Sequence, residues 1–129
     1  MKTERTENYY KNGLVLAFLG DSVFSTMVRT YLVNKYGLKP NALNKKANAV
    51  VCARAQAEFM NEIKPSLTED ELDVVNRARN THSNSKAKNS TLAEYSLATQ
   101  FEALVGYWYL NGEQAKLDEM FKNFIMEKL

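Results

Sequence analysis

Two acidic residues in apolar surroundings, far apart in the sequence, are the side chains with the clearest potential for chemistry. Asp21 follows the apolar run 14–19 and Gly20, and Glu102 lies inside the segment 101–106. A carboxylate beside a hydrophobic face is costly unless a metal ion, a cation or a helix N-terminus compensates its charge. Because the two acids have similar surroundings, we predict that they belong to one shared site.

The chemistry that this pair suggests is divalent-metal chemistry on phosphates. On a helical wheel Asp21 falls at the edge of the apolar stripe, so its carboxylate would emerge at the rim of a cleft. If the helices that carry them cross nearby, Asp21 and Glu102 together would bind one Mg²⁺. This ion takes one or two protein carboxylates, keeps several waters and leaves positions for phosphate oxygens. The bound metal would activate a water and stabilise the charge that builds on the phosphate.

Simpler roles stay open for both acids at the level of the residues alone. If the chain breaks at Gly20, Asp21 would instead be the N-terminal cap of a helix that begins at Ser22. Glu102 would be a solvated helix residue, or the partner of a nearby arginine, if its helix turned it outward. Spacing by itself does not choose between these roles and the metal site.

The elements that must position these acids are all predicted to be helices. Apolar residues recur every three to four positions over 12–36, which predicts a first helix that ends before Pro40. A second helix is expected over about 40–61, ending before Pro65. The acids would therefore lie on long helices joined by short connections.

Two capping boxes mark the starts of the later helices. Thr68 with Glu71 opens a third helix, and Thr91 with Glu94 opens a fourth that reaches about Leu110. A last amphipathic helix is expected to run to the C-terminus, and no internal repeat or strand pattern interrupts the series. The predicted fold class is all-α, with residues 1–129 forming a single domain.

The composition indicates the class of protein to which this domain belongs and the environment in which it is found. Hydrophobic residues make up 45% and charged residues 25% of the 129 residues, as in an ordinary soluble globular protein. The apolar run 14–19 is too short to span a membrane, and residues 1–11 do not have the layout of a signal peptide. Cys52 is the single cysteine, which fits a reducing cytoplasm, and its Ala- and Val-rich surroundings predict a small core residue.

Cations are clustered in two parts of the sequence, as a nucleic-acid backbone requires, although solvated faces carry such clusters too. No acid occurs between Asp73 and Glu94, where the sequence has Arg77, Arg79, Lys86 and Lys88. The second group consists of Lys39, Lys45, Lys46 and Arg54. His82 lies in the first stretch, and only its residue type suggests a general base.

Two segments of the sequence resemble a known family. Residues 16–24 resemble the signature helix of the ribonuclease III catalytic domain, and residues 101–106 resemble its second metal-binding segment. The closer resemblance is to the Mini-ribonuclease III branch, which lacks a separate double-stranded-RNA-binding domain. Further similar segments are Asn12-Gly13-Leu14, Lys39-Pro40-Asn41-Ala42-Leu43, Ala53-Arg54-Ala55-Gln56-Ala57, Arg77-Ala78-Arg79-Asn80 and Lys88-Asn89.

The resemblance implies an all-helical, homodimeric endoribonuclease. Signature helices would pack across the two-fold axis, and the two acidic clusters would cut opposite strands of double-stranded RNA. Asp21 matches the catalytic aspartate and Glu102 the metal-binding glutamate of the family, whose cofactor is Mg²⁺, with Mn²⁺ as a substitute. The family role is trimming of the ends of the 23S (large-subunit) ribosomal RNA precursor in the cytoplasm.

The sequence departs from the fuller ribonuclease III pattern at two positions. Ala17 and Thr99 stand where that pattern has acids, an absence that the Mini branch shares. With two acids only, we expect weak Mg²⁺ binding that strengthens when RNA phosphates complete the ligand shell. Without a separate RNA-binding domain, the RNA would be bound by Arg77, Arg79, Lys86, Lys88, Lys45 and Lys46. The rival interpretation is a non-catalytic helical dimer that binds structured RNA or a ribosome-assembly partner.

Overall fold

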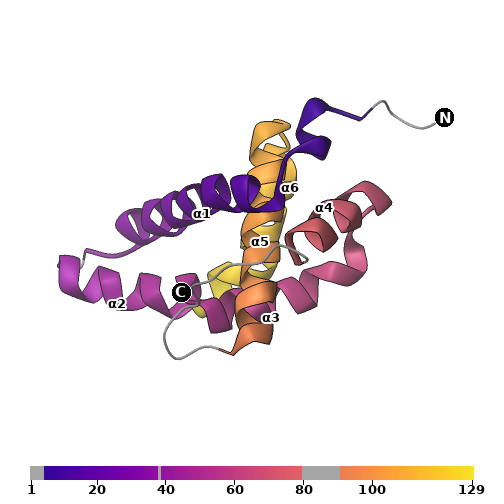
Figure 1. Cartoon of the computed structure of the whole chain (residues 1–129). Coiled ribbons are helices and arrows are strands. Elements are labelled where there is room, and N and C mark those ends of the chain that lie inside the picture. The colour runs from indigo at the N-terminus through magenta and orange to yellow at the C-terminus, as the bar shows by residue number, and fades with distance from the viewer. Residues whose placement is uncertain (1–4, 38, 80–90) are drawn as a thin grey trace.

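The computed structural model of the protein describes residues 5–37, 39–79 and 91–129, and all regular structure within them is helical (Figure 1). The all-α prediction is therefore confirmed. The described residues form six α-helices: α1 Gly13–Lys35, α2 Pro40–Val51, α3 Ala53–Ile63, α4 Glu69–Arg79, α5 Leu92–Leu110 and α6 Gln114–Met120. Short 3₁₀ helices, η1 Glu7–Tyr10, η2 Lys64–Ser66 and η4 Met126–Lys128, and a π-helix, η3 Phe121–Ile125, accompany them. None of these described helices has the length and apolar character needed to cross a membrane.

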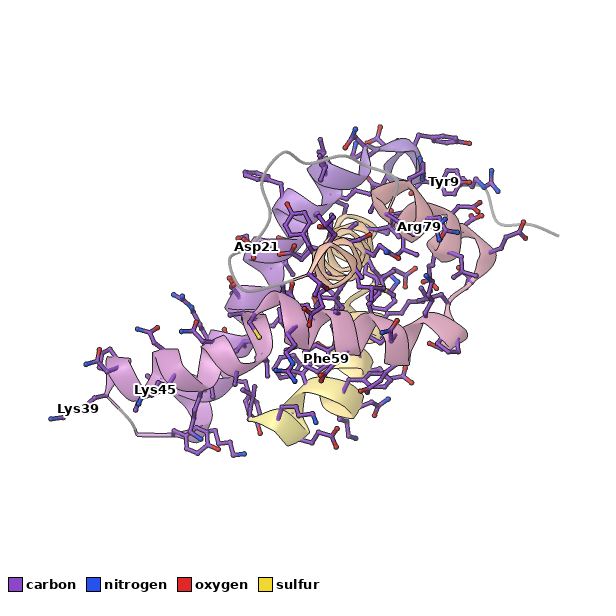
Figure 2. The ribbon with its side chains drawn as sticks, turned by 60° about the horizontal axis from the view of Figure 1, so that its bottom comes forward. Tyr9, Asp21, Lys39, Lys45, Phe59 and Arg79 are labelled. Carbon is purple, nitrogen blue, oxygen red and sulfur yellow. The ribbon has the colours of Figure 1, made fainter. Side chains whose placement is uncertain are left out.

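Helix α5 is the centre of the fold, and α1, α3 and α4 pack against it (Figure 1). From 98 to 108 every residue of α5 is buried except Glu102, which is half-buried. A helix that is apolar on all sides is stable only inside a core, so α5 must be surrounded. Seen along its axis, α5 is enclosed by the other helices (Figure 2). Its Phe101 ring contacts Phe24 of α1 and Phe59 of α3, with ring centroids 4.9 Å and 5.9 Å apart.

The helix ends follow the predicted capping signals. Thr91 and Glu94 exchange both hydrogen bonds of a capping box at the start of α5, and the box of Thr68 and Glu71 is also complete. Asn12 caps the start of helix α1, and its side chain accepts hydrogen bonds from the backbone N–H groups of Leu14 and Val15. Since α1 then runs unbroken to Lys35, the interpretation of Asp21 as a helix cap is wrong.

The predicted second helix is in fact two helices. Helix α2 ends at Val51, Cys52 is extended (φ −72°, ψ 157°), and α3 begins at Ala53. The break lets α2 pack against α1 while α3 packs against α5, which one straight helix could not do. Cys52 lies at this bend with an exposed side chain, so its prediction as a core residue is wrong.

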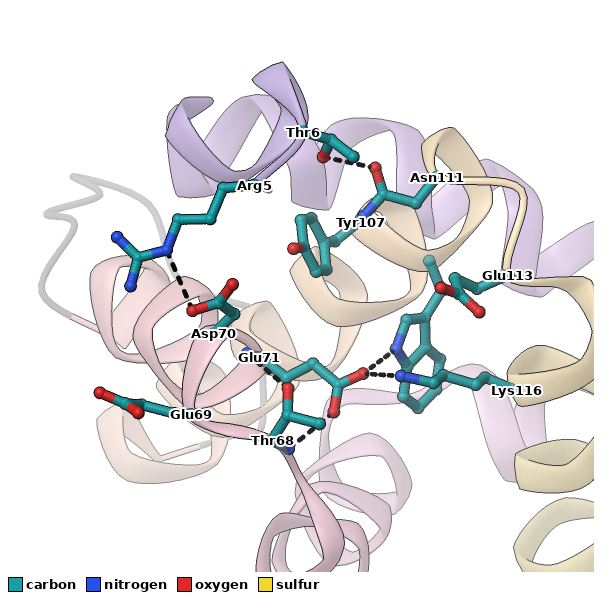
Figure 3. A pocket seen from close by; sticks show the side chains of 11 residues that line it. Arg5, Thr6, Thr68, Glu69, Asp70, Glu71, Tyr107, Asn111, Glu113 and Lys116 are labelled. Carbon is teal, nitrogen blue, oxygen red and sulfur yellow. Dashed lines mark hydrogen bonds and ion pairs between the residues drawn. The ribbon is translucent and has the colours of Figure 1, made fainter. Parts of the chain in front are cut away.

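A buried carboxylate joins α4, α5 and α6 on the side of α5 shown in Figure 3. Glu71 is 4% exposed and accepts hydrogen bonds from the Trp108 indole and the Lys116 ammonium, both at 2.7 Å, as well as from the backbone N–H of Thr68. Burial alone would raise the pKa of Glu71, but the hydrogen bonds from Lys116, Thr68 and Trp108 outweigh burial and hold this pKa below its usual value. Glu71 therefore caps helix α4 and also accepts hydrogen bonds in the core from Trp108 of α5 and Lys116 of α6.

Replacing Glu71 by alanine should lower the free energy of unfolding by about 2–3 kcal/mol, because the buried Trp108 N–H loses its acceptor and Lys116 its partner. Because the folded-state pKa of Glu71 is depressed, this contribution is present at neutral pH and is lost as the pH falls below about 4.5. Urea unfolding at pH 7 and at pH 3 measures both effects. Glu69→Ala, an exposed change in the same helical turn, is the control and should change the stability little.

Candidate metal site and RNA-binding surface

Helices α1 and α5 touch backbone to backbone where Gly20 faces the turn between Glu102 and Gly106. A Cβ atom built on Gly20 would lie 1.7 Å from the Glu102 carbonyl oxygen, and one on Gly106 would lie 2.1 Å from the Leu16 carbonyl oxygen. Real Cβ atoms do not approach other atoms so closely, so neither position tolerates a side chain without movement. The helices that carry the two acidic segments therefore cross here, as a shared site requires.

This crossing brings Asp21 and Glu102 into direct contact through a side-chain hydrogen bond. Asp21 is exposed on α1, beside α5, which Figure 2 shows end-on, whereas Glu102 is half-buried. Burial, together with the hydrogen bond and the negative charge of Asp21, raises the pKa of Glu102 to about 8. At neutral pH Glu102 is therefore mostly protonated, and its carboxyl group donates the hydrogen bond to Asp21. Its partner is a second acid, and not an arginine.

This pair of acids fits a hard divalent cation. Asp21 and Glu102 would hold such a cation together, and its charge would relieve the repulsion between the two carboxyl groups. The described residues hold no group of three or more His, Cys, Asp and Glu side chains that could share one metal ion. Waters and substrate oxygens would supply the other ligands, as they commonly do for Mg²⁺.

The two positions that lack an acid are filled by packed side chains. Ala17 on α1 and Thr99 on α5 are both buried. The Thr99 hydroxyl donates to the carbonyl of Tyr95 in its own helix at 2.9 Å, so it is turned toward the backbone. The chain therefore offers two carboxyl groups here, where the fuller pattern offers four.

Two of the predicted RNA-binding lysines, Lys45 and Lys46, lie on α2. Lys45 is exposed, and Figure 2 shows it with Lys39 at the outer part of the α2 end of the molecule. The Lys46 ammonium lies 4.5 Å from the centre of the Tyr36 ring, which holds this side chain against the end of α1. The sequence analysis missed two further exposed cations of this region, Arg29 and Lys35. The sequence does indicate a basic surface here, because no acid occurs between residues 22 and 57.

Arg77 makes an intramolecular contact that the sequence did not predict. Its guanidinium donates to the carbonyl of Tyr9 and lies 4.7 Å from the centre of the Tyr9 ring. The Tyr9 hydroxyl in turn donates to Asp73 at 2.7 Å, and Arg5 covers the same ring at 4.2 Å while pairing with Asp70. These contacts hold the N-terminal segment onto α4.

The structure describes only some of the other basic residues that were predicted in this stretch. Arg79 is exposed at the end of α4. Lys86, Lys88 and His82 lie outside the described residues, so their predicted roles stay predictions.

Comparison with known proteins identifies a family whose members share this pair of segments. A family model described as the ribonuclease III domain matches residues 14–113, which include both acids and the glycine crossing. The chain belongs to the ribonuclease III family. Ribonuclease III proteins generally depend on a divalent metal, act on double-stranded RNA and typically form dimers.

Curated relatives place the chain in the Mini-ribonuclease III branch of this family. It is 50% identical over 109 residues to a Mini-ribonuclease 3 of Brevibacillus brevis, covering 84% of this chain and 81% of the relative. It is 44% identical over 112 residues to that of Clostridium tetani, covering 86% and 74%. A crystal structure of a protein from Fusobacterium nucleatum superposes with a TM-score of 0.84 at 30% identity, covering 93% and 96%. The chain is thus an endoribonuclease of the ribonuclease III type.

Proposed function

We propose that this ribonuclease III protein cuts double-stranded RNA with the help of Mg²⁺ held by Asp21 and Glu102, with Mn²⁺ as a substitute. The observation that carries the proposal is the contact between the two carboxyl groups at the α1–α5 crossing, where burial and repulsion raise the pKa of Glu102 to about 8. A pair of carboxyl groups that shares one proton still carries one negative charge, and binding of a cation would release that proton. We further propose that the cellular role is cytoplasmic trimming of the 23S ribosomal RNA precursor.

Each acid has a separate task in this proposal. Asp21, which is exposed, supplies a charged ligand at the rim, and Glu102, which is half-buried, becomes a ligand only after it releases its proton. When bound, the cation supplies an activated water and charge stabilisation at the phosphate. Because the chain contributes two carboxylates, free Mg²⁺ is bound weakly, and phosphate oxygens of the RNA strengthen the binding.

The test of this function is cleavage of long duplex RNA with and without Mg²⁺. We expect cleavage that requires Mg²⁺ and stops when a chelator is added, and cleavage of a precursor 23S transcript near its ends. Binding of the duplex without any cleavage would favour the rival, a non-catalytic dimer that binds structured RNA or a ribosome-assembly partner. Cleavage of an unrelated duplex with no preference for the precursor would argue against the ribosomal role alone.

An exposed apolar stripe on α1 supports a homodimer. Phe18 is 84% exposed, Val15 is 57% exposed, and Leu14 lies beside them, all on the face of α1 that points away from α5. Exposed large apolar side chains grouped on one helix are typical of a protein–protein interface. We propose that α1 packs against α1 of a second copy around a two-fold axis, so that the same patch is used twice.

Replacing Phe18 by glutamate should dissociate this dimer, because two copies of the charge would meet near the axis. We expect the dimer dissociation constant to rise at least about 100-fold, consistent with the loss of a buried aromatic anchor. Light scattering coupled to size-exclusion chromatography measures the change. Leu92→Glu is the matched control, since Leu92 is 70% exposed on α5 and outside the proposed interface. A Phe18→Glu protein that stays dimeric would exclude this face as the interface.

Phosphate binding is the role that we propose for the six predicted basic residues, Arg77, Arg79, Lys86, Lys88, Lys45 and Lys46. Recognition of an A-form duplex would depend on its shape, phosphates and 2′-hydroxyls. For Arg77 the contact with Tyr9 adds a competing structural role. The salt dependence of RNA binding separates these two roles.

Replacing Lys45 and Arg79 together by glutamine should weaken duplex binding and reduce the salt slope of log K by about 1 for each phosphate contact that is lost. Both residues are exposed, so the melting temperature should stay unchanged. Arg77→Gln should lower the melting temperature by several degrees, because it removes the contacts with Tyr9. Fluorescence anisotropy at several salt concentrations and thermal unfolding measure these effects. An unchanged salt slope in the double variant would mean that these two cations do not bind the phosphates.

A further inference from the structure

We propose that Gly20 and Gly106 are positioning residues of the metal site, which they create by letting α1 and α5 meet at their backbones. This inference rests on the proposed metal role of Asp21 and Glu102 and extends it to residues that carry no ligand atom. Their contact is reciprocal: Gly20 faces the Glu102 carbonyl and the Gly106 N–H, and Gly106 faces the Leu16 carbonyl and the Gly20 N–H.

Two glycines inside long helices need a physical reason. Glycine disfavours the helical state relative to alanine, because it loses more backbone entropy and buries no side chain. Gly20 lies in the first half of α1 and Gly106 in the last third of α5, and both are helical and buried. Neither has the positive φ that would explain a glycine, unlike Gly112, whose φ is 69°. Close approach of the two helices is therefore what these glycines provide.

The position of this contact decides the distance between the two acids. Asp21 directly follows Gly20, and the Glu102 carbonyl itself is the atom nearest to the missing Gly20 side chain. A methyl group on Gly20 must push this carbonyl away, and the Glu102 side chain moves with its own backbone. The acids would then separate at the point where a shared cation requires both. Metal sites lose affinity steeply when a supporting residue lets a ligand move.

The experiment measures Mn²⁺ binding by electron paramagnetic resonance for the wild-type protein and three glycine-to-alanine variants. Gly20→Ala should raise the Mn²⁺ dissociation constant about 10-fold or more. Gly13→Ala is the matched destabilised control, because a Cβ there would lie 2.6 Å from the Ala78 Cα of α4 and not against α5. It should lower the melting temperature with little change in Mn²⁺ affinity. Gly37→Ala, with nothing within 4 Å of its Cβ, should leave both unchanged.

The outcomes separate this inference from the function on which it rests. A folded Gly20→Ala protein that binds Mn²⁺ within about twofold of the wild type would overturn the positioning role and leave the proposed function intact. A wild-type protein whose Mn²⁺ binding is absent, or is unchanged by Asp21→Asn, would overturn both. If Gly20→Ala is unfolded in buffer, the titration is repeated with Gly106→Ala and in a stabilising osmolyte. Recovered helical circular dichroism with wild-type Mn²⁺ affinity would again overturn the inference.

Discussion

Replacing Asp21 by asparagine should reduce the rate of duplex cleavage by about 10²–10⁴-fold, while duplex affinity and helical content stay unchanged. Asparagine keeps the size of the side chain but removes the negative charge that would hold the cation. Loss of the several kcal/mol that a cation contributes to transition-state stabilisation corresponds to a rate change of this order. Asp21 is exposed and packs little, so the fold should not depend on it.

Single-turnover cleavage with saturating enzyme measures this effect without interference from product release. Ser22→Ala is the control, because Ser22 is the exposed neighbour of Asp21 on α1 and carries no charge. Raising Mg²⁺ should not restore the Asp21→Asn rate fully, since the variant lacks one of the two carboxyl groups that would hold the ion. Cleavage by Asp21→Asn at the wild-type rate would falsify the metal role of this residue.

Replacing Glu102 by glutamine should abolish efficient cleavage and yet stabilise the metal-free protein at alkaline pH. The folded-state pKa of Glu102 is raised to about 8, above the value of 4.5 for a free glutamate. Between these two values the folded state binds more protons than the unfolded state, so the free energy of unfolding falls as the pH rises. Glutamine keeps a hydrogen-bond donor toward Asp21 and cannot ionise, so it removes this dependence.

Thermal unfolding in chelator at pH 5, 6.5 and 8.5 measures the effect. We expect the wild-type melting temperature to fall through this range and that of Glu102→Gln to stay about 5 °C or more above it at pH 8.5. Saturating Mg²⁺ should raise the wild-type melting temperature at pH 8.5 and leave the variant unchanged. Glu58→Gln, an exposed change on α3, is the control and should follow the wild type. Parallel wild-type and Glu102→Gln curves would mean that Glu102 is not the titrating group.

Local signals predicted most of the helical framework. The capping boxes at Thr68 and Thr91 act within one turn of the chain, so their hydrogen bonds follow from the sequence alone. The bend at Cys52 could not be predicted in this way, because neither neighbour is a glycine or proline and the reason for the bend lies in two distant packing partners. Tertiary contact overrode a continuous helical pattern at that point.

The candidate site could be predicted only in part, because it too depends on contacts between residues that are distant in the sequence. Asp21 and Glu102 were identified as a pair from their similar surroundings, and the structure brings them into hydrogen-bond contact. Their shared proton depends on burial and distance, which a sequence does not state. The contact of Arg77 with Tyr9 joins residues 68 positions apart, so no local sequence pattern predicts it. Charge clustering alone therefore could not separate cations held by the fold from cations open to a ligand.

Three faces of helix α1 have different roles in the proposed dimeric enzyme, and this limits where α1 can be changed. Its inner face meets the α5 backbone at Gly20, its rim carries Asp21, and its outer face carries Phe18. In a mutational scan, substitutions at Gly20, Asp21 and Phe18 should therefore each impair the enzyme, and each for a different reason. Substitutions that alter substrate preference should instead be found on α2, where exposed side chains such as Lys45 do not pack against the core. Libraries for directed evolution are best concentrated there.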